Sequence, residues 1–302
     1  VASGSSAVAT SIHSLCATGD KIVSSPRLYG GTWNLFTNTF ARLGIDVRFA
    51  DPSDPDSFRK LADENTRAFF GETLPNPKLE LFPIAEIAAI GNELGIPLII
   101  DNTTAPITCR PIEHGASIVV HSVTKYIGGH GTTIGGVIID SGKFNWLKHA
   151  SQHPTFNTPD PSYHGAIWST LVPEALGVPI AYALRARVVL LRDLGAALSP
   201  TNAFHLIQGL ETLPLRYRAH QENASAVAGF LEQQEAVASV NHPSLFTGIQ
   251  KERADKYLTT GYGPIIGIEL KEGIEAGRKF IDNLKLLYHV ANIGDARSLA
   301  IH

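Results

Sequence analysis

The first half of the chain alternates between short apolar runs and longer amphipathic segments. Three runs, Lys21–Ser24, Arg67–Glu72 and Pro97–Ile100, are bounded by turn residues and predict buried strands. Pro83–Leu94 instead places its apolar residues at helical spacing and is closed by Gly95, which predicts an amphipathic helix. Strands that alternate with helices in this way predict a mostly parallel sheet with helices on both faces.

The same reasoning predicts further elements in this half. A Ser-Gly turn before an alanine-rich stretch predicts a helix that begins near Gly4. Phe40–Phe49 predicts the end of a helix and a strand, and Phe58–Glu64 predicts a helix. Ile118–Lys125 is a β-rich run, and Gly135–Asp140 predicts one more strand.

The second half is less regular at first. Ser141–Trp168 is rich in His, Pro and aromatic residues and predicts a functional loop or a surface excursion. Ile180–Leu198 predicts a strong helix, and Leu215–Gln234 predicts a long helix that leads to a smaller domain. Within that domain Ile265–Leu270 predicts a strand and Gly273–Leu284 a helix.

Composition narrows the class of protein. The chain has 302 residues and 44% hydrophobic residues, enough for one large domain and part of another. The net charge of −3 argues against nucleic acid as a partner. Cys16 and Cys109 give neither a metal spacing nor a disulfide framework, which fits a reducing, cytoplasmic location. No apolar run reaches the roughly 18 residues of a membrane span, and no metal-ligand cluster is visible.

Polar residues with distinctive chemistry follow two of the predicted strands. Asp101 ends one strand, and the next β-rich run delivers Ser122, Thr124 and Lys125 ahead of a glycine-rich turn. A lysine amine condenses with an aldehyde to form a Schiff base. A carboxylate holds a pyridinium nitrogen protonated, and hydroxyls hold a phosphate. These are the requirements of pyridoxal 5'-phosphate (PLP).

The segment Ser122–Gly131, SVTKYIGGHG, resembles the PLP-lysine motif of the Cys/Met-metabolism PLP-dependent enzymes. Within that family the sequence is most similar to O-acetylhomoserine sulfhydrylases, over nearly the whole chain. The resemblance implies an α/β fold, the PLP-dependent transferase fold of aspartate aminotransferase type I. It also implies a large PLP-binding domain at 1–215 with a mostly parallel sheet, and a smaller C-terminal α+β domain at 216–302.

The resemblance implies a phosphate site and a reacting lysine. Gly4 and Ser5 would bind the phosphate at a helix N-terminus, where free backbone N–H groups favour anions. Ser122 and Thr124 would bind the same group. Lys125 would hold the cofactor aldehyde and later move the α-proton of the substrate. An ordinary N-cap is the alternative for the first pair.

Four other residues take roles from the resemblance. Tyr29 would stack on the cofactor ring and assist proton transfer, and Asp101 would keep the ring nitrogen protonated. Asn76 would contact the phenolic oxygen of the cofactor and the substrate carboxylate, which Ser298 would also bind. The alternatives are a buried tyrosine before a Gly-Gly turn, a Pro-Asn-Pro turn and an acid that only caps a helix or turn. His121 and His130 are interpreted as structural.

The chain contains no methionine, and it begins and ends within motifs. We therefore expect a fragment that lacks an N-terminal segment and part of the small domain. The alternative is a naturally short enzyme without methionine. The resemblance places the arginine that binds the substrate carboxylate after His302. It places phosphate ligands from a neighbouring subunit before Val1. It implies a homotetramer built from two dimers with shared active sites.

The implied reaction is γ-replacement on O-acetyl-L-homoserine with sulfide or a small thiol, giving L-homocysteine or methionine and acetate. The alternative is a reaction of the cystathionine γ-synthase, cystathionine γ-lyase or methionine γ-lyase type. The long segment Ser141–Trp168 favours a sulfhydrylase, because the synthases and lyases are short here. A protein of this fold without catalysis is disfavoured because Lys125, Asp101 and Tyr29 are all present.

Overall fold

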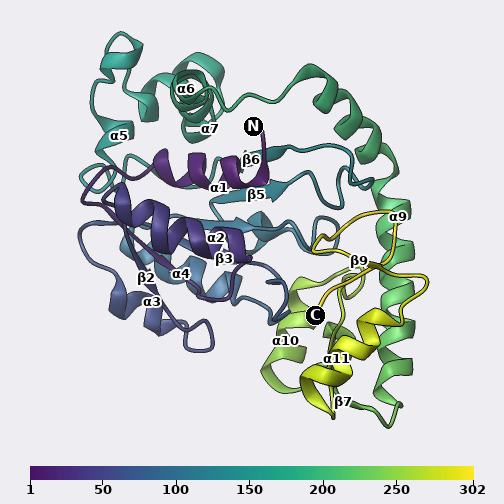
Figure 1. Ribbon diagram of the computed structural model, residues 1–302. Coiled ribbons are helices and arrows are strands. Elements are labelled where there is room, and N and C mark those ends of the chain that lie inside the picture. Colours follow the sequence, from purple (N-terminus) through teal and green to yellow (C-terminus); the bar gives the residue numbers. More distant parts are fainter.

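A six-stranded sheet forms the centre of the computed structural model, which describes all residues from Val1 to His302 (Figure 1). The strand order is β2-β1-β3-β4-β5-β6. The strands are β1 Lys21–Ser24, β2 Asp46–Phe49, β3 Thr66–Glu72, β4 Leu98–Asp101, β5 Ile118–Ser122 and β6 Gly136–Asp140. β1 to β5 pair in parallel and β6 is antiparallel to β5, which confirms the predicted mostly parallel sheet.

Successive residues of the central strands pack on opposite faces of the sheet. Phe70 and Ile99 belong to one buried apolar cluster, whereas Phe69 and Ile100 belong to another. This is expected for strands that are buried on both sides, because side chains alternate between the two faces. The two clusters explain why these strands are continuous apolar runs in the sequence.

The helices of the first half are α1 Gly4–His13, α2 Gly30–Asn34, α3 Asp56–Leu61 and α4 Ile84–Leu94. Three of them, α1, α3 and α4, lie close to their predicted positions, whereas α2 was not predicted. Ser3 caps α1 by accepting a hydrogen bond from Ser6 N (3.0 Å). Gly95 ends α4 in the left-handed conformation with φ 74°, as the sequence predicted. A π-helical turn, Leu35–Phe40, extends α2, and a 3-10 turn, Pro111–His114, precedes β5.

The segment from Ser141 to Trp168 lies mostly at the surface, as a surface excursion would, but several of its side chains enter the core. It has little regular structure beyond α5 (Pro154–Asn157) and a 3-10 turn at Pro161–Tyr163. However, its aromatic side chains are buried in the apolar cluster on one face of the sheet, including Phe144, Trp146, Phe156 and Trp168. The aromatic composition that suggested a loop instead supplies core volume.

The helical stretch predicted at Ile180–Leu198 ends earlier than expected. It consists of α7 (Ala181–Arg185), a π-helical stretch (Ala186–Leu191) and α8 (Arg192–Leu194), and it follows α6 (Trp168–Leu176). Gly195 takes the left-handed conformation with φ 71° and stops the helix after Leu194.

The longest helix, α9 (Pro200–Glu232), begins well before the predicted Leu215. Ser199 caps it by accepting from Asn202 N (3.1 Å), and the helix continues through Pro214. Proline usually interrupts a helix, but α9 includes Pro214 and so extends on both sides of it. α9 runs along one side of the molecule from the sheet towards the C-terminal elements, and the predicted domain boundary at 215/216 falls inside it (Figure 1).

The C-terminal elements form a smaller α+β region. β7 (Val237–Asn241) and β8 (Gly267–Leu270) pair antiparallel, and β9 (Tyr288–His289) pairs in parallel with β10 (Leu299–Ala300). The helices here are α10 (Gly248–Tyr257) and α11 (Gly273–Asp282), and a 3-10 turn spans Pro243–Leu245. The strand and the helix predicted near β8 and α11 are confirmed. None of the helices combines the length and apolar character that crossing a membrane requires.

Candidate functional site

The candidate site lies where the parallel strands end. Glu72, Asp101 and Ser122 are the last residues of β3, β4 and β5. Carboxyl ends of parallel strands meet at one edge of a sheet, where ligands of open α/β folds bind. The structure therefore brings residues far apart in the sequence to one place.

Two buried carboxyls lie next to each other at this edge. Glu72 and Asp101 are register partners in β3 and β4. Glu72 is 5% exposed, and burial raises its pKa well above the usual range, with the charge of Asp101 adding to the rise. Asp101 is partly accessible to solvent but lies deep among protein atoms, and burial raises its pKa as well.

Thr103 connects Asp101 to the end of β5. Asp101 Oδ1 accepts from Thr103 N (2.9 Å) and from Thr103 Oγ1 (2.6 Å), and Thr103 Oγ1 accepts from Ser122 N (2.8 Å). These hydrogen bonds favour the charged carboxylate and oppose the rise in the pKa of Asp101. The second carboxylate oxygen, Oδ2, makes no hydrogen bond within the chain, so it is available to a bound group.

Glu72 also fixes the position of Tyr29. Tyr29 N, at the start of α2, donates to Glu72 Oε1 (2.7 Å). The tyrosine is 53% exposed, so it is not the buried residue that the alternative interpretation required. Its ring lies over Gly31, where an added Cβ atom would be 2.5 Å from Tyr29 Cε1. The ring is therefore presented at the surface of the site.

The start of α1 meets the end of β5. A Cβ atom on Gly4 would lie 2.4 Å from Ser122 Cβ, so only glycine allows this approach. The N–H groups of Gly4 and Ser5 belong to the first helical turn and have no intrahelical acceptor. Gly4, Ser5 and Ser122 are thus brought together around free backbone donors.

The chain turns sharply after β5 and carries Lys125 on this turn. The strand ends at Ser122, three residues before the end of the predicted β-rich run, and Lys125 N donates to Ser122 O (3.2 Å). Thr124 Oγ1 donates to Gly135 O (3.2 Å) and accepts from Gly135 N (3.1 Å), which ties the turn to the start of β6. Burial lowers the pKa of the Lys125 ammonium, which favours its neutral form.

Asn292 contacts Lys125, and the sequence analysis did not identify it. Lys125 Nζ donates to Asn292 Oδ1. Nearby, a Cβ atom on Gly294 would lie 2.4 Å from Tyr126 N, so the segment between β9 and β10 lies directly on the lysine turn. Asn292 belongs to the same motif as Ser298, but only the three-dimensional contact distinguishes it. Ser298 is exposed and its side chain makes no hydrogen bond, so no hydrogen bond connects it to Lys125.

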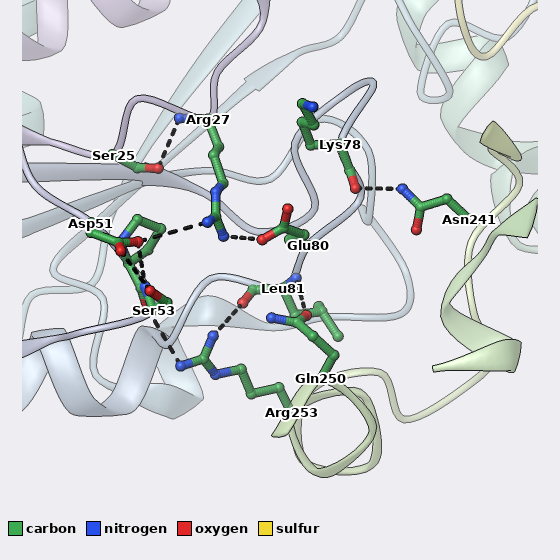
Figure 2. A network of polar contacts seen from close by, with 11 residues as sticks. Ser25, Arg27, Asp51, Ser53, Lys78, Glu80, Leu81, Asn241, Gln250 and Arg253 are labelled. Atoms are coloured by element: carbon green, nitrogen blue, oxygen red, sulfur yellow. Dashed lines mark hydrogen bonds and ion pairs between the residues drawn. The ribbon is translucent and has the colours of Figure 1, made fainter. Parts of the chain in front are cut away.

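Asn76 lies in the loop after β3, which elements of the C-terminal region hold in place (Figure 2). Asn76 is partly exposed and its side chain makes no hydrogen bond. Asn241 Nδ2 donates to Lys78 O (2.6 Å). From α10, Gln250 accepts from Leu81 N (2.8 Å), and Arg253 Nη1 donates to Leu81 O (3.2 Å).

Arg27 holds the same loop from the sheet side (Figure 2). Its guanidinium forms ion pairs with Glu80 and, at 3.7 Å, with Asp51. Arg253 Nη2 donates to Pro52 O (3.5 Å), so the buried Arg253 bridges the loop and the turn that follows β2. The backbone around Asn76 is therefore held by both halves of the chain.

A polar cavity of about 400 Å³ lies between the glycine-rich turn and α9. No hydrophobic side chain lines it, and its wall includes Thr124, His130, Thr133, His205, Gln208 and Thr212. His130 Nδ1 contacts Gly128 O (2.7 Å), whereas His121 is buried in the sheet and burial lowers its pKa to about 4. No three His, Cys, Asp or Glu side chains are grouped so that they could hold a metal ion.

Comparison with known proteins identifies close relatives. An O-acetyl-L-homoserine sulfhydrylase of Leptospira meyeri is 50% identical over 307 aligned residues, covering 100% of this chain and 69% of that protein. A homocysteine synthase of Schizosaccharomyces pombe is 44% identical, covering 99% of this chain and 69% of that protein.

A solved structure agrees with these relatives. It is a Campylobacter jejuni protein described as an O-acetylhomoserine (thiol)-lyase, which carries N'-pyridoxyl-lysine-5'-monophosphate. It superimposes with a TM-score of 0.93 at 38% identity, covering 100% of this chain and 73% of that one. The family described as Cys/Met metabolism PLP-dependent enzyme matches residues 1–302. The chain therefore belongs to the Cys/Met metabolism family of PLP-dependent enzymes.

Proposed function

We propose that this protein catalyses γ-replacement on O-acetyl-L-homoserine, with sulfide or a small thiol as the nucleophile. The Cγ–O bond to acetate breaks and a Cγ–S bond forms, so sulfide gives L-homocysteine and methanethiol gives methionine. The observation that carries the proposal is that Lys125, Asp101 and Tyr29 lie at the sheet edge of a chain half identical to a sulfhydrylase.

The residues at the start of α1 fit the phosphate of PLP. Gly4 and Ser5 supply backbone N–H groups at a helix N-terminus, which attract anions. The close approach of Gly4 to Ser122 places a hydroxyl beside these donors. Thr124 is the fourth proposed ligand, and it lines the polar cavity. To bind the phosphate, the Thr124 hydroxyl would give up the hydrogen bond that it donates to Gly135 O.

The strand ends fit the ring of the cofactor. Asp101 Oδ2 has no partner in the chain, and we assign it to the protonated ring nitrogen. The opposite charge there would lower the pKa of Asp101 and offset the cost of its burial. The exposed ring of Tyr29 would lie against the cofactor ring. Asn76 would donate its amide to the phenolic oxygen and to the substrate carboxylate, and Ser298 would also bind that carboxylate.

Lys125 is the proposed attachment point and proton carrier. When bound, PLP withdraws electrons from the substrate, so that protons on Cα and Cβ become acidic enough to be removed. Burial lowers the pKa of Lys125 and so shifts the amine towards the neutral form that can accept the Cα proton. Asn292 Oδ1 accepts from Lys125 Nζ and thereby orients the amine.

Product analysis tests the reaction. The holoenzyme should form homocysteine from O-acetyl-L-homoserine and sulfide at least about tenfold faster than from the O-succinyl ester. Cysteine in place of sulfide should give little cystathionine. Cystathionine as the main product would support a γ-synthase instead. Release of ammonia from cystathionine or methionine without an added thiol would support a γ-lyase.

Borohydride reduction tests the site. Reducing the holoenzyme and mapping its peptides should place a pyridoxyl group on Lys125, and Lys125→Ala should abolish both label and turnover. Lys143→Ala is a suitable control because Lys143 is exposed and lies outside the site. A pyridoxyl group on another lysine would refute the assignment.

We also propose the domain division 1–215 and 216–302. All six strands of the large sheet precede residue 215, and both small sheets follow residue 216. α9 would then be shared by both domains. A cytoplasmic location is a further proposal, supported by Cys16 and Cys109, which are both free and buried.

The proposed assembly is a homo-oligomer, a tetramer of two dimers with shared sites. α9 exposes five large apolar side chains, each more than half accessible: Phe204, Ile207, Leu210, Leu215 and Phe230. An apolar surface of this kind is typical of a protein interface. Sedimentation should show an oligomer that Leu210→Asp weakens and the exposed-site control Arg218→Ala does not. A fully active, cofactor-saturated monomer would exclude shared sites.

A further inference from the structure

Arg216, in the middle of α9, directs its guanidinium at the turn that follows Lys125. Nη1 donates to Tyr126 O (2.9 Å) and Nη2 donates to Ile127 O (3.2 Å). Arg216 forms no ion pair, and all of its hydrogen bonds are to backbone carbonyls or to Thr212. Its charge is therefore committed to backbone carbonyls and not to an ion pair.

The guanidinium is anchored on its own helix as well. Nε donates to Thr212 Oγ1 (3.0 Å), and Nη2 also donates to Gly209 O (2.6 Å). Arg216 is partly buried, and burial lowers its pKa. Removing a cation from water costs free energy unless its donors are hydrogen-bonded. The four hydrogen bonds of Arg216 meet this requirement and hold the guanidinium in one orientation.

The two carbonyls that Arg216 binds lack other donors. Gly129 N returns to Lys125 O (2.7 Å), and Gly129 then takes the left-handed conformation with φ 74°. No backbone N–H donates to Tyr126 O or Ile127 O. The carbonyls at the end of a helical turn are left unpaired, and a cation there is stabilising.

Two glycines leave the space that this contact needs. A Cβ atom on Gly129 would lie 2.1 Å from Arg216 Nη1. A Cβ atom on Gly209 would lie 2.5 Å from both Ile127 O and Gly128 O. A side chain at Gly209 would push α9 away from the turn, and a side chain at Gly129 would displace the guanidinium from its carbonyls. The glycine-rich sequence after Lys125 therefore accommodates the guanidinium as well as a ligand.

We propose that Arg216 is a positioning residue for Lys125: its guanidinium holds the Tyr126 and Ile127 carbonyls and so fixes the turn from which the lysine side chain extends. The effect on catalysis rests on the proposed function of Lys125. A lysine that both holds a cofactor and moves a proton needs accurate placement, and an error of about 1 Å costs on the order of 10²-fold in rate.

A purely structural role for Arg216 makes a different prediction. If Arg216 only stabilised the fold, its substitution would lower the free energy of unfolding of the whole chain and would not affect the lysine turn in particular. The distinguishing measurements are therefore local amide exchange over residues 123–131 and the separation of kcat from KM. The matched control is Arg218→Ala, on the same helix, because Arg218 is exposed and its nearest carboxylate, Glu222, lies 4.0 Å away.

In the holoenzyme, Arg216→Ala should lower kcat by about 10²-fold and leave KM for O-acetyl-L-homoserine within about threefold. Amide exchange should accelerate at 123–131 and remain unchanged in the central strands. Arg216→Lys should lower kcat by about tenfold, because a single ammonium does not reproduce the forked geometry of a guanidinium. Arg218→Ala should match the wild type in every measurement.

Chemical rescue sharpens the test. Guanidinium ions, added to Arg216→Ala far below denaturing concentrations, should restore about tenfold of the lost kcat and slow the exchange of the turn. Methylammonium at the same concentration should not, because it lacks the planar fork. Rescue of this kind is not expected for a general loss of stability.

The proposal is overturned if Arg216→Ala keeps kcat within about twofold of the wild type and leaves exchange at 123–131 unchanged. If Arg216→Ala does not fold, Arg216→Lys becomes the test. A kcat and an amide exchange rate at 123–131 equal to those of the wild type in Arg216→Lys would also refute the proposal. Failure of the proposed reaction is separate, because it would appear in the wild-type enzyme. Amide exchange at residues 123–131 would still show whether Arg216 holds the turn, even if the proposed reaction were wrong.

Discussion

Glu72 and Asp101 are neighbours at the ends of β3 and β4; Glu72 is buried and Asp101 is half-buried. Glu72 accepts the backbone N–H of Tyr29, so it fixes a proposed cofactor contact. Because burial and the neighbouring charge both raise its pKa, Glu72 favours its protonated form. Asp101, held by Thr103, is then the carboxylate that is left to face a cationic ring nitrogen.

This relationship predicts an unusual dependence of stability on pH. Above the ordinary glutamate pKa the unfolded chain loses the Glu72 proton, whereas the folded chain retains it up to the raised pKa. The folded state then binds more protons, so Glu72 makes the free energy of unfolding fall as pH rises through this window. The loss is about 1.4 kcal/mol for each unit by which the pKa is raised.

Glu72→Gln should remove this loss of stability at high pH, because a glutamine has no proton to lose there. Its amide oxygen can still accept the hydrogen bond from Tyr29 N. Urea unfolding of the cofactor-free protein should give equal stabilities near pH 4 and a variant more stable than the wild type near pH 8. Glu113→Gln, at an exposed carboxyl, should differ from the wild type by less than about 0.5 kcal/mol throughout. A difference between wild type and Glu72→Gln that stays constant with pH would contradict the prediction.

Asp101→Asn should retain PLP but slow the removal of the α-proton by on the order of 10²–10³-fold, because a neutral amide does not stabilise a protonated ring nitrogen. The substituted side chain can still accept from Thr103, so the strand end should stay intact. Exchange of the α-hydrogen of a non-reacting amino acid in heavy water, followed by NMR, measures this step directly.

Asp140→Asn is the matched control for Asp101→Asn. Asp140 also ends a strand and has a pKa raised by burial, but it accepts from Gly142 N (2.9 Å) and Ala183 N (3.2 Å), away from the proposed site. Its α-hydrogen exchange should remain within about threefold of the wild type. Near-normal exchange in Asp101→Asn would mean that Asp101 is only a turn residue.

The sheet was predictable because its strands are buried on both faces. Pairs such as Phe69 with Phe70 and Ile99 with Ile100 make each strand a continuous apolar run, and such runs are visible without any structure. The Lys125 motif was equally visible because its residues are adjacent in the sequence. The antiparallel direction of β6 depends on how the chain returns, which a run of apolar residues does not specify.

Other features depend on tertiary contacts. The helix through Pro214 and the burial of Trp146 follow from packing against distant elements, which overrides local propensity. Arg216 and Asn292 gain their contacts only when α9 and the C-terminal segment fold onto the lysine turn. An arginine in a helix is ordinary in sequence, so no local signal distinguishes Arg216 from the exposed Arg218.

Arg253 should contribute to stability through the loop that carries Asn76. It is 7% exposed and binds Leu81 O and Pro52 O (Figure 2). Arg253→Met would leave these carbonyls without a donor, at a cost of about 1–3 kcal/mol. Urea unfolding is the measurement, and Lys251→Met, at a partly exposed site on the same helix, should change stability by less than about 0.5 kcal/mol. Equal stabilities of the two variants would show that the bridge contributes nothing.

Gly209 and Gly229, both within α9, should respond oppositely to substitution by alanine. Alanine stabilises an exposed helix interior by roughly 0.5–1 kcal/mol relative to glycine. Gly229 has no atom within 4 Å of an added Cβ, so Gly229→Ala should gain about this amount. At Gly209 the added Cβ would lie 2.5 Å from two backbone oxygens that cannot rotate away. Gly209→Ala should therefore lose about 1–3 kcal/mol in urea unfolding despite its better helix propensity. It should also accelerate amide exchange in the Lys125 turn, whereas Gly229→Ala should not. If both variants were stabilised, α9 would not pack against the turn as closely as the structure has it.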